Sequence, residues 1–123
     1  MPTLNDRVFD NGLTVLDTEA NKITITSQEA TTYAEGNATF ALGASTSLSI
    51  AAPSDRTGGG REVVVAAISD GSVSADGTAT HYAILDTVNS RLLATGNLNA
   101  SQAVSSGNTF TLGSFTIGIP DPT

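Results

Sequence analysis

The residues that most often perform catalysis are scarce in this sequence. His81 is the only histidine, and the chain has no cysteine. A serine nucleophile would need His81 as its base, yet no Gly-x-Ser-x-Gly elbow is present. The same counts exclude metal sites built on several histidine or thiolate ligands. We therefore interpret His81 as a surface residue or a hydrogen-bonded core residue, and we expect no catalytic residue, no cofactor and no enzymatic activity.

Three aspartates, Asp70, Asp76 and Asp86, offer the oxygen ligands that calcium prefers. Their spacing lacks the acidic density of a dedicated calcium loop, and Asp-Gly, which occurs at Asp70 and Asp76, is a common turn pair. We therefore favour turns over a metal site. Paired carboxylates of a glycosidase are compatible with the sequence. However, only Tyr33 and Tyr82 join the four Phe as sugar platforms, which disfavours carbohydrate binding.

The stretch Arg56-Thr57-Gly58-Gly59-Gly60-Arg61 is the strongest loop signal in the chain. A phosphate-cradling loop is one interpretation, but the Lys-Ser/Thr ending of a Walker motif is missing. The remaining interpretations are a flexible connection, or a loop that becomes ordered only against a neighbouring subunit.

The charge of the chain limits its partners. Net charge is −7 with five basic residues, so phosphate-backbone binding lacks its driving force and no direct contact with nucleic acid is expected. Charged residues make up 14% of the chain, which lowers the cost of burying its surface against other proteins. The N-terminus does not resemble a signal peptide, and the longest apolar run, 63–68, is too short to cross a bilayer. We expect a soluble protein, made in a cytoplasm, that has no membrane contact.

The elements that must position any binding residues are strands. Apolar and polar residues alternate with a period of two, and no window shows a sustained period of 3.6. The pattern predicts an all-β chain, most simply a single-domain β-sandwich, with a jelly roll or small barrel as the alternative. Residues 1–11 are predicted to form an extended N-terminal arm or edge strand, and residues 12–123 to form the single β domain.

Individual strands are predicted from runs between turn residues. We expect a hairpin over 12–27 and a strand over 62–69 that is covered on both faces. Residues 28–36 fit either one helical turn capped by Ser27 or extended chain. The remaining expectations are turns at Asp70-Gly71 and Asp76-Gly77, strands over 78–86 and 91–95 joined by the turn 87–90, and closing strands around Phe110, Leu112, Phe115 and Ile117.

Six stretches in the last two-thirds of the chain carry a family resemblance. They are Asp55-Arg56-Thr57-Gly58-Gly59-Gly60-Arg61, Asp70-Gly71-Ser72-Val73, Thr80-His81-Tyr82-Ala83-Ile84-Leu85-Asp86, Ser90-Arg91-Leu92-Leu93-Ala94, Ser106-Gly107-Asn108-Thr109-Phe110-Thr111-Leu112 and Ile119-Pro120-Asp121-Pro122. Together they resemble small virion proteins of tailed bacteriophages and prophages. These motifs are turns and strands and contain no functional signature.

The resemblance implies a non-enzymatic structural protein located in the virion. Capsid decoration is the expected role, in which a β domain binds across capsomers as a homo-oligomer, for example a trimer. The implied partners are the major capsid protein or other virion proteins. Alternatives are a tail, neck or fibre component of the same particle and, further away, a carbohydrate-binding β-sandwich.

The contacts would come from two segments. The N-terminal arm would add a strand to a neighbour through main-chain hydrogen bonds, and the glycine-rich loop would provide the second contact. The predicted contact residues are Pro2, Thr3, Leu4, Asn5, Arg7, Phe9, Arg56, Gly58, Gly59, Gly60 and Arg61.

Overall fold

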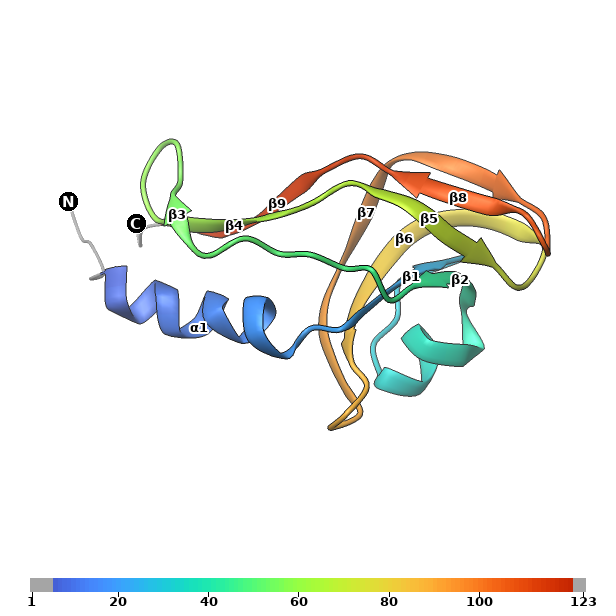
Figure 1. The fold of residues 1–123 in the computed structure, drawn as a ribbon, viewed down its shortest axis with the longest axis horizontal. Coiled ribbons are helices and arrows are strands. Elements are labelled where there is room, and N and C mark those ends of the chain that lie inside the picture. Colours follow the sequence, from blue (N-terminus) through green and yellow to red (C-terminus); the bar gives the residue numbers. More distant parts are fainter. Residues whose placement is uncertain (1–5, 121–123) are drawn as a thin grey trace. The chain divides into compact units, whose positions relative to one another are not determined.

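The computed structural model describes residues 6–120, in which strands outnumber helices (Figure 1). The elements are α1 (Asp6–Glu19), β1 (Lys22–Thr26), the short π-helical turn η1 (Glu35–Thr39), β2 (Ala41–Ser45), β3 (Ser54–Asp55), β4 (Arg61–Val65), β5 (Ile68–Val73), β6 (Gly77–Asp86), β7 (Arg91–Val104), β8 (Thr109–Leu112) and β9 (Phe115–Ile119). The predicted all-β class is confirmed. The strands form two antiparallel sheets, which is consistent with the predicted sandwich.

The chain divides into two compact units that are interleaved in sequence. Unit 1 contains residues 1–19, 49–67 and 113–123, and unit 2 contains residues 20–48 and 68–112. The predicted boundary between an arm over 1–11 and one domain over 12–123 does not coincide with this division. Residue 12 lies inside α1, and this helix belongs with the second and third segments of unit 1.

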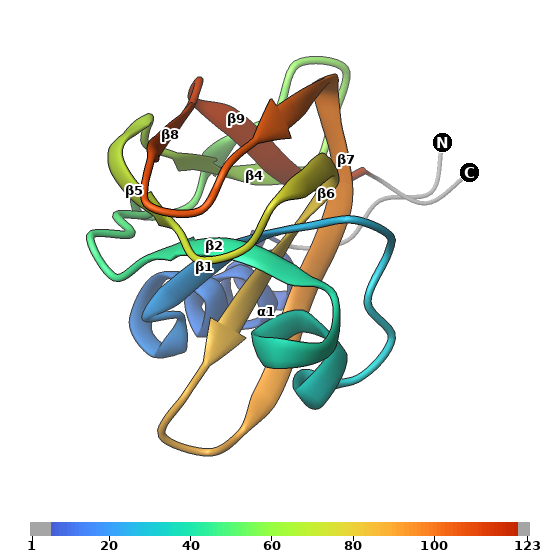
Figure 2. The same cartoon turned by 90° about the vertical axis from the view of Figure 1, so that its right-hand side faces the viewer.

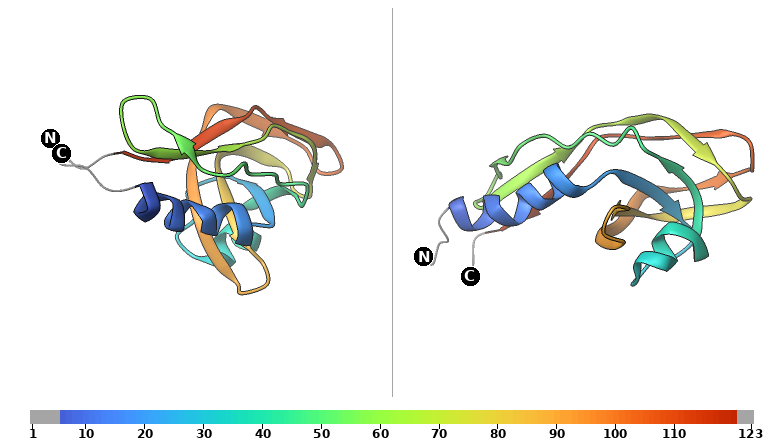
Figure 3. Two further views of the ribbon diagram at one scale, coloured as in Figure 1. Left: turned by 60° about the vertical axis from the view of Figure 1, so that its left-hand side comes forward. Right: turned by 60° about the horizontal axis from the view of Figure 1, so that its bottom comes forward.

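Unit 1 consists of α1 and a three-stranded sheet in the order β3-β4-β9. Strand β4 is central, and it pairs with β9 from Arg61 opposite Ile119 to Val65 opposite Phe115. Helix α1 contacts β4 and lies beside it (Figure 3). The buried apolar side chains of the unit are Leu13, Leu16, Ile50, Val63 and Val65.

The helix α1 corrects two sequence predictions. Residues 6–11 are helical, so the extended arm predicted over 1–11 is wrong there, and residues 1–5 lie outside the described part of the chain. The hairpin predicted over 12–27 is also wrong, because only β1 is a strand. Phe9, Leu13 and Leu16 follow one another at spacings of four and three, which gives the helix one apolar face. Leu13 and Leu16 are indeed buried.

Unit 2 is built on a six-stranded antiparallel sheet in the order β7-β6-β1-β2-β5-β8, whose strong twist is visible in Figure 2. The two outermost strands, β7 and β8, follow each other in sequence. A side-chain hydrogen bond joins them, from Gln102 Nε2 to the carbonyl oxygen of Thr111 at 3.2 Å. The two edge strands of this sheet therefore lie close together, although no ladder of backbone hydrogen bonds joins them.

The central strand β1 is buried on both of its faces. Ile23 and Ile25 alternate with Thr24 and Thr26, and all four side chains are fully inaccessible. The segment that was ambiguous in the sequence covers the threonine face: the Thr24 hydroxyl donates to the carbonyl oxygen of Gly36 in η1 at 2.7 Å. The helical turn capped by Ser27 is wrong, because the chain becomes helical only at residue 33, and the Glu35 carboxylate there accepts hydrogen bonds from the backbone N–H and hydroxyl of Thr31.

The region 62–73 differs from its prediction. The predicted strand 62–69 is interrupted at Ala66-Ala67, so that β4 lies in unit 1 and β5 in unit 2. It is not covered on both faces, because Val64 is 38% exposed while Val63 and Val65 are buried. The turn predicted at Asp70-Gly71 is wrong, since both residues lie within β5.

The second half of the chain follows its prediction more closely. The strands expected over 78–86 and 91–95 are confirmed as β6 and β7, joined by the turn at 87–90, although β7 continues to Val104. The turn predicted at Asp76-Gly77 is displaced: the chain bends at Ala75, and Gly77 is the first residue of β6. Strands β8 and β9 are the predicted closing strands.

Candidate interaction surfaces

The N-terminal contact residues divide into two groups. Pro2, Thr3, Leu4 and Asn5 lie outside the described residues. Arg7 and Phe9 lie in α1, so their backbone groups are committed to a helix and cannot add a strand to a neighbour. Strand addition by this end of the chain is thus confined to the first five residues.

The predicted loop 56–61 is a hairpin connection between β3 and β4. The backbone N–H of Arg56 donates to the carbonyl oxygen of Gly60 at 3.1 Å, and the N–H of Gly59 donates to the carbonyl oxygen of Arg56 at 3.1 Å. Gly58, Gly59 and Gly60 all have positive φ, at 92°, 105° and 95°. A run of three left-handed residues is strained for any side chain, so this turn requires its glycines.

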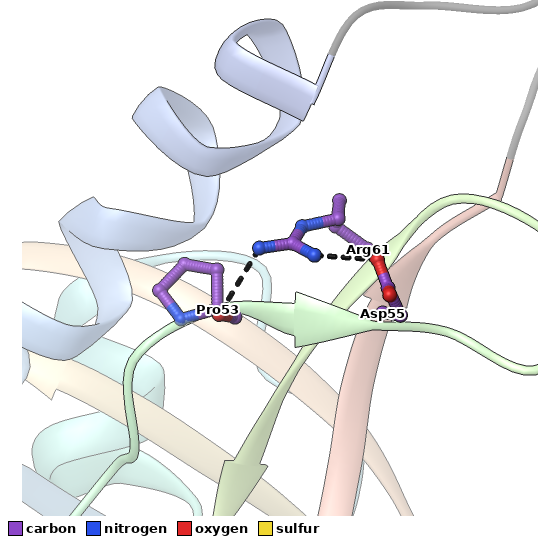
Figure 4. Close-up of polar contacts among 3 residues, drawn as sticks. All are labelled: Pro53, Asp55 and Arg61. Carbon is purple, nitrogen blue, oxygen red and sulfur yellow. Dashed lines mark hydrogen bonds and ion pairs between the residues drawn. The ribbon is translucent and has the colours of Figure 1, made fainter.

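Two arginines hold this hairpin from its own ends, and Figure 4 shows the contacts of one of them, Arg61, with Asp55 and Pro53. Arg61 Nη1 lies 2.6 Å from Asp55 Oδ1, and Arg61 Nη2 donates to the carbonyl oxygen of Pro53 at 3.3 Å. Arg56 Nη1 donates to the carbonyl oxygen of Gly59 at 3.1 Å. The loop is therefore ordered by its own chain. Its exposed tip is Thr57-Gly58, whereas the Arg61 side chain is only 16% exposed.

The two predicted contact segments both belong to unit 1. A Cβ atom at Gly12 of α1 would lie 3.8 Å from Ile119 Cδ1, and Ile119 is the strand partner of Arg61. The fold thus brings the middle of α1 next to the end of β9 that lies beside the hairpin.

The predicted turn at 87–90 between β6 and β7 forms a second hairpin tip, which is not among the predicted contact residues. Val88 is 81% exposed, the highest exposure of any large apolar side chain in the described chain. The buried Asp86 holds the turn: its Oδ1 accepts from the N–H of Val88 at 3.0 Å, and its Oδ2 accepts from Asn89 Nδ2 at 2.8 Å. Figure 1 shows this hairpin, in yellow and orange, extending beyond the other strands of its sheet.

The tip is also tied to the start of β1. Asn21 Oδ1 accepts hydrogen bonds from the backbone N–H and the hydroxyl of Thr87 at 3.0 and 3.1 Å. A valine within a polar turn, flanked by Thr87 and Asn89, is the sequence signal that identifies this surface.

The aspartates considered for calcium have structural partners. Asp70 accepts from the hydroxyls of Ser47 at 2.6 Å and Ser45 at 3.1 Å, which lowers its pKa. The hydrogen bond from the Asn89 side chain, with the N–H groups of Asn89 and Val88 and the charge of Arg91, lowers the pKa of Asp86 against the opposing effect of burial. Asp76 accepts from the N–H of Ser106 at 2.7 Å.

These carboxylates do not form a site together. In the region 6–120, no group of three or more His, Asp or Glu side chains is arranged to hold a metal ion. The hydroxyl of Thr80 lies 2.8 Å from Nδ1 of His81 and also donates to the carbonyl oxygen of Ser27 at 3.0 Å. His81 is half-buried, as expected for a hydrogen-bonded strand residue.

None of the helices between residues 6 and 120 is both long and apolar enough to span a bilayer. Comparison of the chain with protein-family models, with characterised proteins and with solved structures reveals no match.

Proposed function

We propose that this chain is a non-enzymatic structural protein of a bacteriophage virion, and specifically a capsid decoration protein that binds the major capsid protein across capsomers. The resemblance of residues 55–122 to virion proteins supports the setting. The observation that carries a binding role is the β6–β7 tip, where a large apolar side chain is 81% exposed on a turn held by Asp86 and Asn21.

The physical argument concerns the cost of binding. A flexible loop loses conformational entropy when it docks, whereas a turn that is already hydrogen-bonded loses little. The turn at Val88 has its backbone N–H groups at 87, 88 and 89 bound by side chains of its own unit. Docking of Val88 into an apolar pocket would therefore keep most of the gain from burying that side chain, about 1.5–3 kcal/mol at full burial.

The location of this chain in the particle is tested by measuring its copy number in heads and in tails. Heads and tails are separated from purified virions, and the copy number of this chain in each is measured by mass spectrometry. A decoration protein is expected in hundreds of copies on heads. A few copies confined to tails or necks would contradict decoration and favour the alternative structural role.

The binding surface is tested with matched variants of Val88. Val88→Asp is expected to abolish binding to capsids that lack this protein, whereas Val88→Thr, which keeps the shape, weakens it. Ser105→Asp places the same charge on another exposed turn of unit 2 and is expected to leave binding unchanged. Equal binding of Val88→Asp and the wild type would contradict a role for the tip.

The N-terminal contribution is tested separately. Removal of residues 1–5 leaves α1 intact, unlike a longer deletion that would enter the helix. Reduced capsid occupancy with an unchanged melting temperature would support strand addition by this segment. Unchanged occupancy would remove the segment from the proposal.

A further inference from the structure

The outer edge of β9 carries backbone groups that no described strand pairs. In the sheet β3-β4-β9, β9 is an end strand. The carbonyl oxygen of Val64 accepts from the N–H of Ala51 at 3.0 Å, so the peptide groups of Val64 face the β3 side of β4. Those of Val63 and Val65 therefore face β9, because successive residues of a strand alternate in the direction of their hydrogen bonds.

The pairing register transfers this alternation to β9. Val63 lies opposite Ile117 and Val65 opposite Phe115, so Ile117 and Phe115 direct their N–H and C=O groups toward β4. Thr116 and Gly118 then direct theirs away from β4, to the outer edge, and both residues are exposed.

Within its own five residues, this edge strand has none of the features that normally prevent pairing with another chain, although Pro120 follows it and the Arg56 side chain lies against Gly118. Sheet edges are commonly protected by lysine, proline, bulges or very short strands. Strand β9 has five uncharged residues, Phe115-Thr116-Ile117-Gly118-Ile119, paired with β4 without a bulge. The opposite edge strand of the same sheet, β3, has only two residues.

We propose that β9 pairs antiparallel with β9 of a second copy of this chain, around a two-fold axis at Ile117. The order of residues dictates this register. Thr116 of each copy then lies opposite Gly118 of the other copy. Each of these two pairs exchanges two backbone hydrogen bonds. Ile117 then faces its own counterpart in the closer, non-hydrogen-bonded position.

The side chains fit the same register. Phe115, Ile117 and Ile119 share one face of β9, and the pairing sets Phe115 of one copy opposite Ile119 of the other. Ile119 is 37% exposed, so the partner strand would cover apolar surface as well as backbone. On the other face, Thr116 lies opposite Gly118, against which the Arg56 side chain packs. The result is a continuous sheet of order β3-β4-β9-β9-β4-β3.

A second copy is a better occupant than an unrelated extended peptide because the strand is complementary to itself. The contact is isologous, so it closes at two copies and does not by itself form a trimer. Each copy has a net charge of −7, whereas β9 carries no charge. Salt screens the repulsion between copies without weakening this contact, so self-association is expected to increase with ionic strength.

The test uses the purified full chain and is independent of any virion. Sedimentation equilibrium is expected to show a monomer–dimer equilibrium. Thr116→Pro removes an outward N–H while leaving the β4 ladder intact, and it should weaken dimerisation by at least about tenfold. Thr116→Val keeps the N–H and should dimerise like the wild type. A chain that stays monomeric at all concentrations, or a Thr116→Pro variant that dimerises normally, would overturn the proposal.

A second measurement identifies the register without relying on proline. The chain has no cysteine, so a single introduced thiol can react only with its counterpart. Ile117→Cys places two thiols at the axis, within the separation that a disulfide needs. Ile119→Cys places them four strand positions apart, about 13 Å. Rapid oxidative crosslinking of Ile117→Cys alone supports the pairing, whereas equal or faster crosslinking of Ile119→Cys rejects it.

Discussion

The ring of Phe110 in β8 lies over Gly71, its direct partner in β5. The same arrangement recurs elsewhere in the sheet of unit 2, where Tyr82 in β6 covers its partner Gly96 in β7. In both pairs, a Cβ atom on the glycine would overlap the ring. The glycines thus give two of the few aromatic side chains a place against the sheet, and the rings cover backbone that would otherwise lack a side chain.

We predict that Gly71→Ala destabilises the protein by about 1–3 kcal/mol, because the new methyl group forces the buried Phe110 ring out of its position. Gly113→Ala is the matched control, since no atom lies within 4 Å of the added Cβ. Urea denaturation of both variants measures the difference. Equal stability of the two would show that the ring moves aside freely.

Substitutions of the two threonines of β1 are predicted to change the stability of the protein in different directions. Both hydroxyls are buried, but Thr24 donates to Gly36 whereas the hydroxyl of Thr26 has no partner among the described residues. Thr26→Val should be neutral or stabilising, by up to about 1 kcal/mol, because it removes an unsatisfied polar group. Thr24→Val should cost about 1–3 kcal/mol, because it leaves the carbonyl oxygen of Gly36 without its donor. Thermal unfolding of both variants checks the sign of each change.

Alanine substitution in the glycine-rich hairpin should destabilise the protein less at Gly58 than at Gly60. At Gly58, an added Cβ has only Arg56 Nη1 nearby, at 3.9 Å, so Gly58→Ala should cost only the strain of a positive φ, about 1–2 kcal/mol. At Gly60, the Cβ would also overlap the backbone of Ile119 and Pro120. Gly60→Ala should therefore be clearly more destabilising. Similar melting temperatures for the two variants would contradict this packing.

The stability of the protein should fall in acid. Hydrogen bonds lower the folded-state pKa of Asp86, Asp70 and Glu35, whose largest contributions come from Asn89, Ser47 and Thr31 respectively. A carboxyl whose pKa is lower in the folded state stabilises that state above its unfolded pKa, about 4. This contribution disappears as the pH falls through the folded value. Urea midpoints measured from pH 7 to pH 2 should decrease below about pH 5, and less steeply in Asp86→Asn.

The sequence predicted the strands that alternate cleanly between turns. Strands β6, β8 and β9 have period-two patterns with polar turn residues at their ends, and for these local signals agree with tertiary pairing. Asp70-Gly71 shows where local signals mislead. It has turn chemistry, yet Ser45 and Ser47 bind its carboxylate and Phe110 occupies the space above its glycine. Those partners are distant in sequence, so no local pattern contains them.

The error at the N-terminus was a misjudged period. Leu13, Val15 and Asp17 alternate with Thr14 and Leu16 as in a strand, but Leu13 and Leu16 also fit one face of a helix, and both are buried there. Among the candidate contact residues, the loop at 56–61 was located from its glycines. The β9 edge was not, because an edge is defined by the neighbours a strand lacks, and sequence alone does not give sheet order.

The interleaving of the two units bears on how the protein is synthesised. Strand β4 ends at Val65, but its partner β9 begins only at Phe115, after the whole of unit 2. On the ribosome, the edge of β4 that pairs with β9 therefore stays unpaired until residues 115–119 have emerged. Unit 2 lacks β8 until Leu112 has been translated, so both units reach completion at nearly the same moment. Neither sheet can complete its strand pairing earlier, and release of a truncated chain would leave two open sheets prone to association.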